Sequence, residues 1–438
     1  MEGKEIGMTN KKKKTVTYIV MLALGFIFFF LLGDRGVILE KDSHFYFEYQ
    51  KSKMLSPVYA TFIYICQVLI DNYLGLIIMI QGALAILCCM YLTKCIQKEF
   101  GLDNKWAMLV YVLSFVPYAY SLPEYVSTHL VTTEGLTFSI FYLWFVCVLR
   151  GVLHADIKRC LFSNVWAAIL MLTRFQLGLL FGINVLVLGY VVYQISKDKK
   201  KFFQRAFVLG IGIVFAVFLF LKTDTGFVFM DHVANLSFGK VFYVADEEDV
   251  ELYEDEECRK IFNMIVEAID GEKLRFEYAR SGFEQWIDLK QTSLVQVEGN
   301  SILREHVGDV VKIREVRQNL IIPLLIDNLG KYILVNLLLY PESLMCALFV
   351  RKESIYLLCY LMTFFLFGSA IGICFLGKKR MRRESHLYMA LVLLILVVNI
   401  VLINLVLYGL QRYLVYTQGL FYIGYFLMLK DLINKKGN

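Results

Sequence analysis

The sequence predicts an all-α polytopic membrane protein with about ten transmembrane helices. Its 438 residues are 58% hydrophobic and only 19% charged, and the mean hydropathy is +0.58, which is far more apolar than an average soluble domain. Several uncharged runs, among them 72–93, 175–196 and 387–411, are long enough to cross about 30 Å of hydrocarbon. Clusters of lysine and arginine recur between the apolar runs, at residues 11–14, 94–105, 150–159, 197–205, 378–383 and 430–436.

These basic clusters set the expected topology. Placing all of them in the cytoplasm satisfies the positive-inside rule and requires an even number of crossings between successive clusters. Both termini are then cytoplasmic in a plasma membrane. The apolar stretch 321–350 is interrupted by charges, so we expect it to pack on the outer face. The expected spans are 15–33, 73–93, 106–122, 131–149, 161–174, 176–195, 206–222, 353–377, 387–408 and 413–429.

The N-terminal half begins with a helix and a polar loop. The first span follows a basic stretch as a signal peptide would, but it lacks a small-residue cleavage site, so we expect a retained signal-anchor helix. An external loop, 34–72, follows. If its apolar stretch Met54–Ile70 crossed the membrane, every later basic cluster would lie outside the cell. We therefore expect this stretch to form a juxtamembrane helix. The chain thus divides into a transmembrane part (1–222), an external α-rich segment (223–352) and C-terminal transmembrane helices (353–438).

The segment 223–352 is expected to be a small α-rich domain or ordered loop outside the membrane. Near its start, the acidic run Asp246–Asp249 is interpreted as a solvated face, since EF-hand spacing for calcium is absent. Apolar residues then recur at helical spacing between Ile261 and Ile269. Further helix-like stretches follow at 272–290 and 301–319.

Several classes of enzyme and carrier lack their sequence signatures. No P-loop or Rossmann glycine pattern occurs, and neither do the HExxH and GxSxG motifs. This disfavours an ATP-driven pump, an enzyme with a cytosolic nucleotide-sugar domain, and a serine hydrolase. The ten cysteines lie mostly inside apolar runs without a CxxC pair, so we interpret them as small buried hydrophobes. No nucleic-acid partner is predicted.

Ionisable residues gather instead at the expected outer ends of spans, where charge is costly and a functional role is the default hypothesis. Arg174 is the clearest case, because it is the only charged residue between 160 and 196 and lies at a turn between two spans. Such an arginine needs an anion, either a carboxylate in a structural ion pair or the phosphate of a lipid-linked ligand. Arg412 presents the same choice at another tight turn. The other ionisable residues in such positions are Asp34, Asp42, Glu124, His129 and Glu134.

Short motifs follow one another along the chain in a fixed order. Asp42 and Tyr46 form a D-x-x-x-Y pattern in the first loop, SPVY at 56–59 opens the next helix, and VTTEGL places Glu134 at the start of a span. LTRFQLGLL at 172–180 and QRYLVY at 411–416 complete the series. In order and sidedness they resemble the GT-C superfamily of integral-membrane glycosyltransferases, which includes protein O-mannosyltransferases, the lipid A aminoarabinose transferase and many bacterial cell-envelope enzymes. The paired Asp-Glu of the mannosyltransferases is absent.

The resemblance implies a reaction as well as a fold. A sugar would move, with inversion, from a polyprenyl-phosphate donor in the membrane lipid to a glycan, lipid or protein acceptor outside the cell. Asp42 would be the base that takes the acceptor proton, with Asp34 as its substitute. Arg174 or Arg412 would stabilise the leaving phosphate, alone or with a divalent cation such as Mg²⁺ or Mn²⁺.

The resemblance also assigns residues to the walls of the substrate site. Glu134 would orient an acceptor group or complete a metal site. His44, Tyr46 and Tyr49 would face the sugar or, alternatively, pack against the membrane. Tyr413 would join the substrate site beside its neighbour in the QRYLVY motif.

Other interpretations of the sequence stay open. An O-antigen polymerase or ligase also combines many spans with one large external loop, and it would place catalysis within 223–352. A non-enzymatic lipid-linked-glycan flippase or other transporter would show inverted repeats or broken helices near the midplane. A scaffold subunit of another envelope enzyme would keep the same order of spans and loops but lack the catalytic base.

Overall fold

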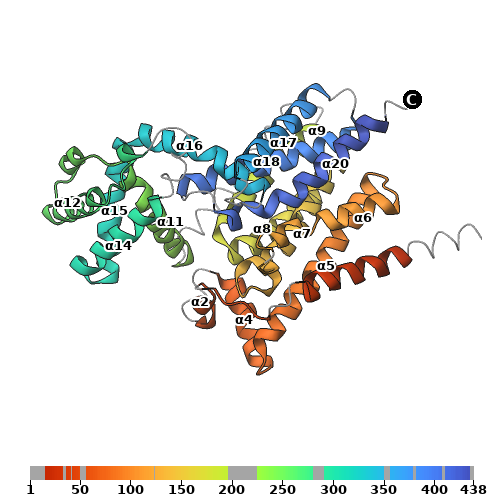
Figure 1. Cartoon of the computed structure of the whole chain (residues 1–438), viewed down its shortest axis with the longest axis horizontal. Helices are drawn as coiled ribbons and strands as arrows, with labels where there is room; N and C mark the ends of the chain where they lie inside the picture. Colours follow the sequence, from red (N-terminus) through yellow and green to blue (C-terminus); the bar gives the residue numbers. More distant parts are fainter. Residues whose placement is uncertain are drawn as a thin grey trace, which may run out of the picture. The chain divides into compact units, whose positions relative to one another are not determined.

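The computed structural model describes residues 15–32, 36–40, 42–49, 56–122, 124–195, 224–279, 291–349, 356–377, 381–406 and 410–434. These residues form helices joined by short turns, which confirms the all-α class, and their one extended pairing is an isolated parallel bridge between Ile38 and Leu130. The chain divides into two compact units (Figure 1). The first comprises Met1–Leu219, Ala347–Leu396 and Val415–Asn438, and the second comprises Phe220–Cys346 and Val397–Leu414.

The first unit is built from apolar helices of unequal length. Residues Thr15–Leu31 form an apolar helix that ends in a π-helical turn, Ile27–Leu31. Its remaining elements are α2 (Ser43–Phe47), α4 (Pro57–Leu69), α5 (Tyr73–Glu99), α6 (Asn104–Leu113), α7 (Thr133–His154), α8 (Ile157–Thr173), α9 (Leu179–Ile195), α17 (Tyr356–Leu376), the larger part of α18 (Arg383–Val406), α20 (Gln418–Asn434) and the 3₁₀ turns Val116–Ala119, Ser127–His129, Phe175–Gly178 and Val415–Thr417.

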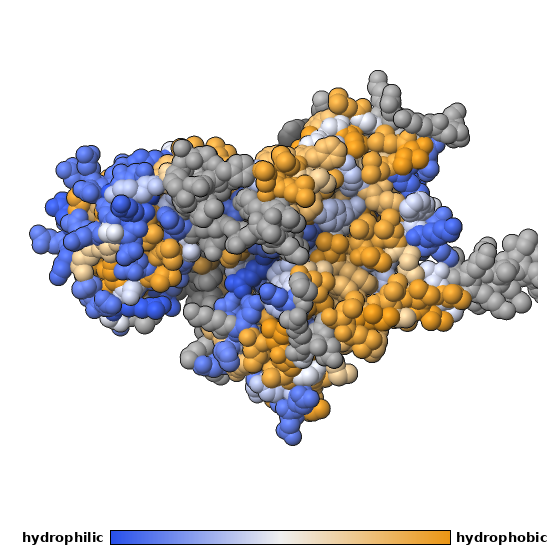
Figure 2. Space-filling view, in the orientation of Figure 1, coloured by the Kyte–Doolittle hydropathy of each residue, from blue (hydrophilic) through white to orange (hydrophobic). Residues whose placement is uncertain are grey.

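Six of the described helices are long and apolar enough to cross a membrane. Apolar side chains also cover much of their surface: on α17, for example, Leu361 and Phe365 are 59% and 65% exposed. Figure 2 shows this hydrophobic surface over the helices of the first unit. The protein is therefore a polytopic membrane protein. The six helices are Tyr73–Glu99, Thr133–His154, Phe175–Ile195, Leu329–Leu348, Leu357–Leu376 and Arg383–Val406.

The arrangement of individual spans differs in part from the sequence prediction. The expected span 106–122 is interrupted, because α6 ends at Leu113 and a 3₁₀ turn with Pro117 follows, where proline cannot donate a helical hydrogen bond. The expected spans 161–174 and 413–429 correspond to helices of 17 residues, α8 and α20. The helix Leu329–Leu348, expected on the outer face, is long and apolar enough to cross. The expected span 206–222 lies outside the described residues, and ten crossings stay a prediction.

The predicted juxtamembrane stretch is a separate short helix. Helix α4 opens with Pro57 in its first turn and runs for 13 residues to Leu69, which is about 20 Å of helix and too short to cross hydrocarbon. One face, with Tyr59 and Ile63, is buried, whereas Val68 and Leu69 are 68% and 69% exposed. The helix is thus confirmed as an element, and its place in the interface stays a prediction.

The second unit is a helical bundle with a core of its own. It contains α11 (Asp224–Tyr243), α12 (Glu256–Gly271), α14 (Thr292–Val307), α15 (Val310–Asp327) and most of α16 (Leu329–Leu348), together with the end of α18 (Arg383–Val406) and α19 (Gln411–Leu414). Side chains of α12 confirm the predicted amphipathic helix, since Ile261, Phe262, Ile265 and Ile269 are all buried in this core. The opposite faces of these helices are largely hydrophilic (Figure 2).

Two sequence predictions in the second unit differ in part from the described structure. The acidic run Asp246–Asp249 is only partly a solvated face: Asp249 is 7% exposed and its carboxylate accepts a hydrogen bond from Asn328 at 2.8 Å. Asp249 also accepts from the backbone of Asp246, closing a capping box around a 3₁₀ turn. The expected helix at 272–290 is absent from its described part, where only the 3₁₀ turn Phe276–Tyr278 forms.

Lys240 lies almost completely inside the second unit. Its side chain is 1% exposed, and its ammonium donates hydrogen bonds to Asn336 at 3.0 Å and to the carbonyl of Asn404. Loss of water around the charge lowers the pKa of Lys240 to about 7. The lysine therefore joins α11 to α16 and α18 through neutral oxygens, and its charge opposes folding near neutral pH.

We expect the second unit to become more stable as pH rises from 7 to 9. Between pH 7 and 9 the lysine is protonated in the unfolded chain, where its pKa is near 10.5, but loses its proton in the folded chain. The free energy of unfolding therefore rises by about 1 kcal/mol per pH unit. Thermal unfolding of the full chain measures this, with Lys240→Met as the test and the exposed Lys260→Met as the control. An equal pH dependence in wild type and Lys240→Met would contradict the prediction.

Candidate active site around Glu134 and Arg174

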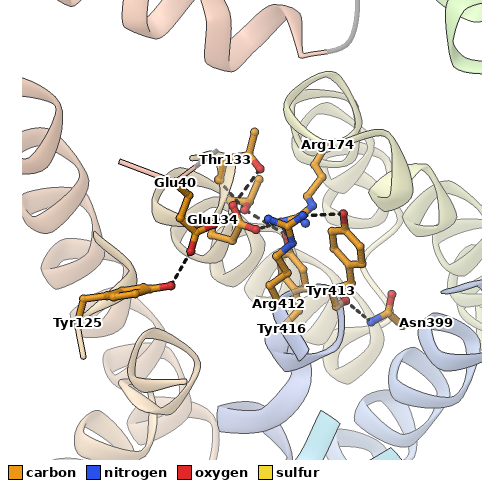
Figure 3. Close-up of polar contacts among 10 residues, drawn as sticks. Glu40, Tyr125, Thr133, Glu134, Arg174, Asn399, Arg412, Tyr413 and Tyr416 are labelled. Atoms are coloured by element: carbon orange, nitrogen blue, oxygen red, sulfur yellow. Dashed lines mark hydrogen bonds and ion pairs between the residues drawn. The ribbon is translucent and has the colours of Figure 1, made fainter. Parts of the chain in front are cut away.

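The centre of the candidate site is a buried ion pair in the first unit. A guanidinium nitrogen of Arg174 lies 2.7 Å from a carboxylate oxygen of Glu134, and their side chains are 11% and 2% exposed (Figure 3). The second oxygen of Glu134 accepts from the hydroxyl of Thr133 at 3.3 Å. Charges buried this deeply need such partners, because the surrounding apolar helices offer no solvation of their own.

Both charged residues lie at helix ends that suit them. Glu134 is in the first turn of α7, where the helix dipole favours a negative charge. Arg174 follows the last residue of α8 and has an extended backbone, and its amide donates to Leu170 at 2.8 Å. A 3₁₀ turn, Phe175–Gly178, then leads into α9. The break predicted at Arg174 is confirmed, and it places a cation at a helix C-terminus.

A hydroxyl network extends the ion pair toward the C-terminal helices of the same unit. Arg174 also donates to the phenol of Tyr416 at 3.2 Å, and this phenol lies 3.2 Å from the hydroxyl of Thr137 (Figure 3). Thr137 is one turn beyond Glu134 on α7 and donates to the carbonyl of Thr133 at 2.8 Å. Tyr416, itself held by Thr137, thus fixes the guanidinium nitrogen that pairs with Glu134.

The start of α7 is held by an amide from another helix. The Gln81 amide, 0% exposed on α5, donates to the carbonyls of Thr128 and Leu130 at 2.9 and 3.2 Å, and its oxygen accepts from Tyr59 of α4 at 3.2 Å. Gly135 allows this approach, because a Cβ there would lie 2.5 Å from the amide nitrogen. One buried side chain therefore fixes the turn before Glu134 and the helix behind the first loop.

His129 anchors the turn from the opposite side. It is 4% exposed, with one ring nitrogen 2.7 Å from the carbonyl oxygen of Phe29 and the other 3.2 Å from that of Gly36. The neighbouring backbone pairs with Ile38, whose amide donates to the carbonyl of His129 and whose carbonyl accepts from Val131. His129, singled out in the sequence as an ionisable residue at a span end, is thus a positioning residue for the first loop. Glu124, singled out with it, is exposed.

The loop residues of the D-x-x-x-Y pattern lie close to the ion pair. Asp42 is exposed before α2, and Tyr46 is half-buried on it, with its ring 4.9 Å from that of Tyr59 in an edge-to-face contact. Burial above all, together with the nearby charges of Glu134 and Asp42, raises the pKa of Tyr46 to about 12, whereas Arg174 and a hydrogen bond with Ser56 oppose the shift. The fold thus brings Tyr46 within electrostatic reach of both members of the pair, and Asp42 within reach of Tyr46.

Glu40 is a second carboxylate of this loop with a defined partner. It is half-buried and accepts a hydrogen bond from the phenol of Tyr125 at 2.7 Å (Figure 3). Burial first, and then Glu40 among other groups, raises the pKa of Tyr125 to about 12. Glu40 is therefore not a freely solvated loop residue. Glu48 of the same loop is exposed.

The other predicted site residues have contacts of their own. His44 is exposed and its ring contacts Phe47, and Tyr49 is half-buried and stacks on Tyr64 of α4 at 4.9 Å. Arg412 and Tyr413 belong to the second unit, where the guanidinium of Arg412 lies 5.2 Å from its neighbour's ring centroid. Asp34, the predicted substitute base, lies outside the described residues.

The carboxylates of the candidate site do not fit a resident divalent cation. Over the described ranges, no three His, Cys, Asp or Glu side chains converge as metal ligands. The carboxylate of Glu134, which the sequence interpretation offered to a metal, is taken by Arg174 and Thr133. We therefore derive no step through a metal ion.

Comparison of the chain with protein families, curated proteins and solved structures finds no match. The functional interpretation accordingly rests on the residues and their geometry alone.

Sequence reasoning missed Gln81, Tyr125 and Tyr416. A signal exists for Gln81, because it is the only side-chain amide between residues 73 and 93 of an apolar run, and buried polar groups require partners. The two tyrosines give no such signal, since they are two among 27 in the chain. Only the packing shows that their phenols reach Glu40 and Arg174.

Proposed function

We propose that the protein is a polyprenyl-phosphate-sugar-dependent glycosyltransferase of GT-C type. The observation that carries the proposal is the approach of half-buried Tyr46, on a loop that also bears the exposed carboxylate of Asp42, to the buried pair of Glu134 and Arg174. Each belongs to a motif on which the family resemblance rests. This arrangement supplies a proton acceptor and a cation in one place, which displacement at a sugar phosphate needs.

The proposed chemistry is a single displacement with inversion. The acceptor hydroxyl gives its proton to the carboxylate of Asp42, its oxygen bonds to the anomeric carbon, and the bond from that carbon to the phosphate oxygen breaks. The electron pair stays on the departing polyprenyl phosphate. Arg174, whose charge acts on Tyr46 of this loop, would stabilise the charge on that phosphate, held in place by Glu134 and Tyr416. Tyr46, which is un-ionised at neutral pH, would present a hydroxyl to the sugar.

A transfer assay with the full-length chain in lipid nanodiscs tests the proposal. The donors are polyprenyl-phosphate hexoses and pentoses with labelled sugars, and a cell-envelope extract depleted of this chain supplies acceptors. We expect protein-dependent transfer of label from one donor, with release of an equal amount of polyprenyl phosphate. A polyprenyl-diphosphate oligosaccharide serves as the donor of a polymerase or ligase. Transfer from that donor alone, or from none, would contradict the proposal.

A further inference from the structure

A cluster of arginines in the second unit is unrelated to the candidate active site. Arg317 of α15 is 8% exposed and donates to Asp231 of α11 at 3.2 Å and to Asn300 of α14 at 3.0 Å. Arg314, one turn earlier on α15, donates to the other oxygen of Asp231 at 3.1 Å. Asp231 therefore orients two guanidiniums side by side where three helices meet.

One donor of the cluster has no acceptor among the residues that the structure describes. The Nε of Arg317 is buried and makes no hydrogen bond to any described residue. An unmade hydrogen bond of a buried charged group is costly, and native proteins rarely leave one without a reason. Asn300 is held in turn, since its amide donates to the carbonyl of Gln296 at 2.7 Å. The surroundings of Arg317 are therefore ordered, and its Nε donor is unsatisfied.

Positive charge accumulates around this donor. The charge of Arg304, on the exposed face of α14, also acts on Arg317. Burial first, and then the charges of Arg304 and Arg314, lower the pKa of Arg317, while Asp231 opposes the shift. Among the described residues Arg304 forms no ion pair. Two guanidiniums thus meet at Asp231, and the charge of Arg304, one turn beyond Asn300 on α14, acts on one of them. Arg304 and Arg314 reach solvent.

We propose that Arg304, Arg314 and Arg317 form a binding site for a phosphate group. A tetrahedral phosphate carries up to two negative charges and several acceptor oxygens, and the planar fork of arginine matches it better than lysine does. Arg317 contributes the buried donor, whereas the exposed Arg304 and the one-third exposed side chain of Arg314 leave the site open to solvent. The site lies wholly in the second unit and is independent of the proposed transfer reaction.

Phosphate titration of the full-length chain in detergent tests the site. Sodium phosphate is added at pH 7 and constant ionic strength, with chloride as the replaced anion, and unfolding is followed with a thiol-reactive dye on the buried cysteines. We expect phosphate to raise the unfolding temperature saturably. Arg304→Gln, which removes an exposed charge with no ion-pair partner, should weaken the apparent affinity at least 5-fold. Arg317→Lys, which keeps the charge and loses the fork, should weaken it at least 10-fold.

Lys312→Gln is the matched control. It removes one charge from the same helix, but this lysine pairs with Glu257 of α12, so phosphate affinity should stay within 2-fold of wild type. A phosphate effect equal to that of chloride, or equal in Arg304→Gln and wild type, overturns the proposal. So does a saturable response to acetate without one to phosphate.

Nanodiscs distinguish the two sources of the phosphate group. A phosphate response that persists in phosphatidylglycerol nanodiscs supports the site and assigns it to a soluble phosphate. A response seen in neutral detergent and abolished by phosphatidylglycerol supports the site and assigns it to a lipid headgroup. Loss of the response in both settings overturns the proposal.

Discussion

Replacing Arg174 with alanine should abolish sugar transfer and destabilise the first unit. The change leaves the carboxylate of Glu134, 2% exposed, without its cation, and breaking a buried pair in this way costs about 3–5 kcal/mol. Loss of a cation that stabilises the leaving phosphate should lower kcat by a further 10²–10³-fold, roughly the effect of removing one such donor. Unfolding temperature and initial transfer rate measure the two effects separately.

The double variant Arg174→Ala/Glu134→Gln decides between the two roles of this arginine. Neutralising the carboxylate removes the uncompensated charge, so stability should return toward wild type while transfer stays lost. Arg159→Ala on α8 is the control, because its ion pair with Asp156 is about one-third exposed and should be worth at most about 1 kcal/mol. A double variant that transfers sugar at the wild-type rate would leave Arg174 a structural residue only.

Asp42→Asn should reduce sugar transfer by about 10²–10⁴-fold with little change in stability. The amide has the shape of the carboxylate and cannot take the acceptor proton, and general bases contribute rate factors of about this size. Asp42 is exposed and makes no side-chain capping bond to α2, so the helix does not need its charge. The initial rate at saturating donor measures the effect, and the KM for the donor should change little.

Two carboxylates of the same loop serve as comparisons for Asp42. Glu48→Gln removes an exposed charge six residues on and should leave the rate unchanged. Glu40→Gln keeps the shape of the side chain and an oxygen that can accept the hydrogen bond of Tyr125. It should therefore lower the transfer rate less than Asp42→Asn does. If Asp42→Asn retains wild-type activity and Glu40→Gln loses it, the base is Glu40 and the assignment of Asp42 is wrong.

The sequence predicted much of the candidate site as separate residues. The sequence predicted that Arg174 needs an anionic partner, because it is the one cation in an apolar run and an unpaired charge there is costly. The sequence could not choose between a carboxylate and a substrate phosphate. The fold supplies the carboxylate, 40 positions earlier in the chain, because α7 and α8 pack with Glu134 and Arg174 at adjoining ends. The phosphate role stays a proposal that the double variant tests.

The second unit shows the same division between local and tertiary information. The helix of Ile261 and Ile269 was predictable, because its apolar residues repeat with the period of an α-helix. The burial of Asp249 was not predictable, because nothing in the acidic run distinguishes it from the exposed Glu247 and Glu248. Only the tertiary contact with Asn328 sets it apart. Likewise, the isolated sequence gives no reason to expect a buried ammonium at Lys240.

The sequence by itself determined the helical membrane class, the short helix after the first loop and the break at Arg174. Run length, helical periodicity and single charges are local properties, and their energetic consequences apply wherever the segment packs. Only the tertiary structure decided that Glu134 neutralises Arg174, that Tyr125 holds Glu40 and that Gln81 fixes the turn before α7. A buried charge or amide requires a partner, but which of many candidates it meets depends on how the helices pack.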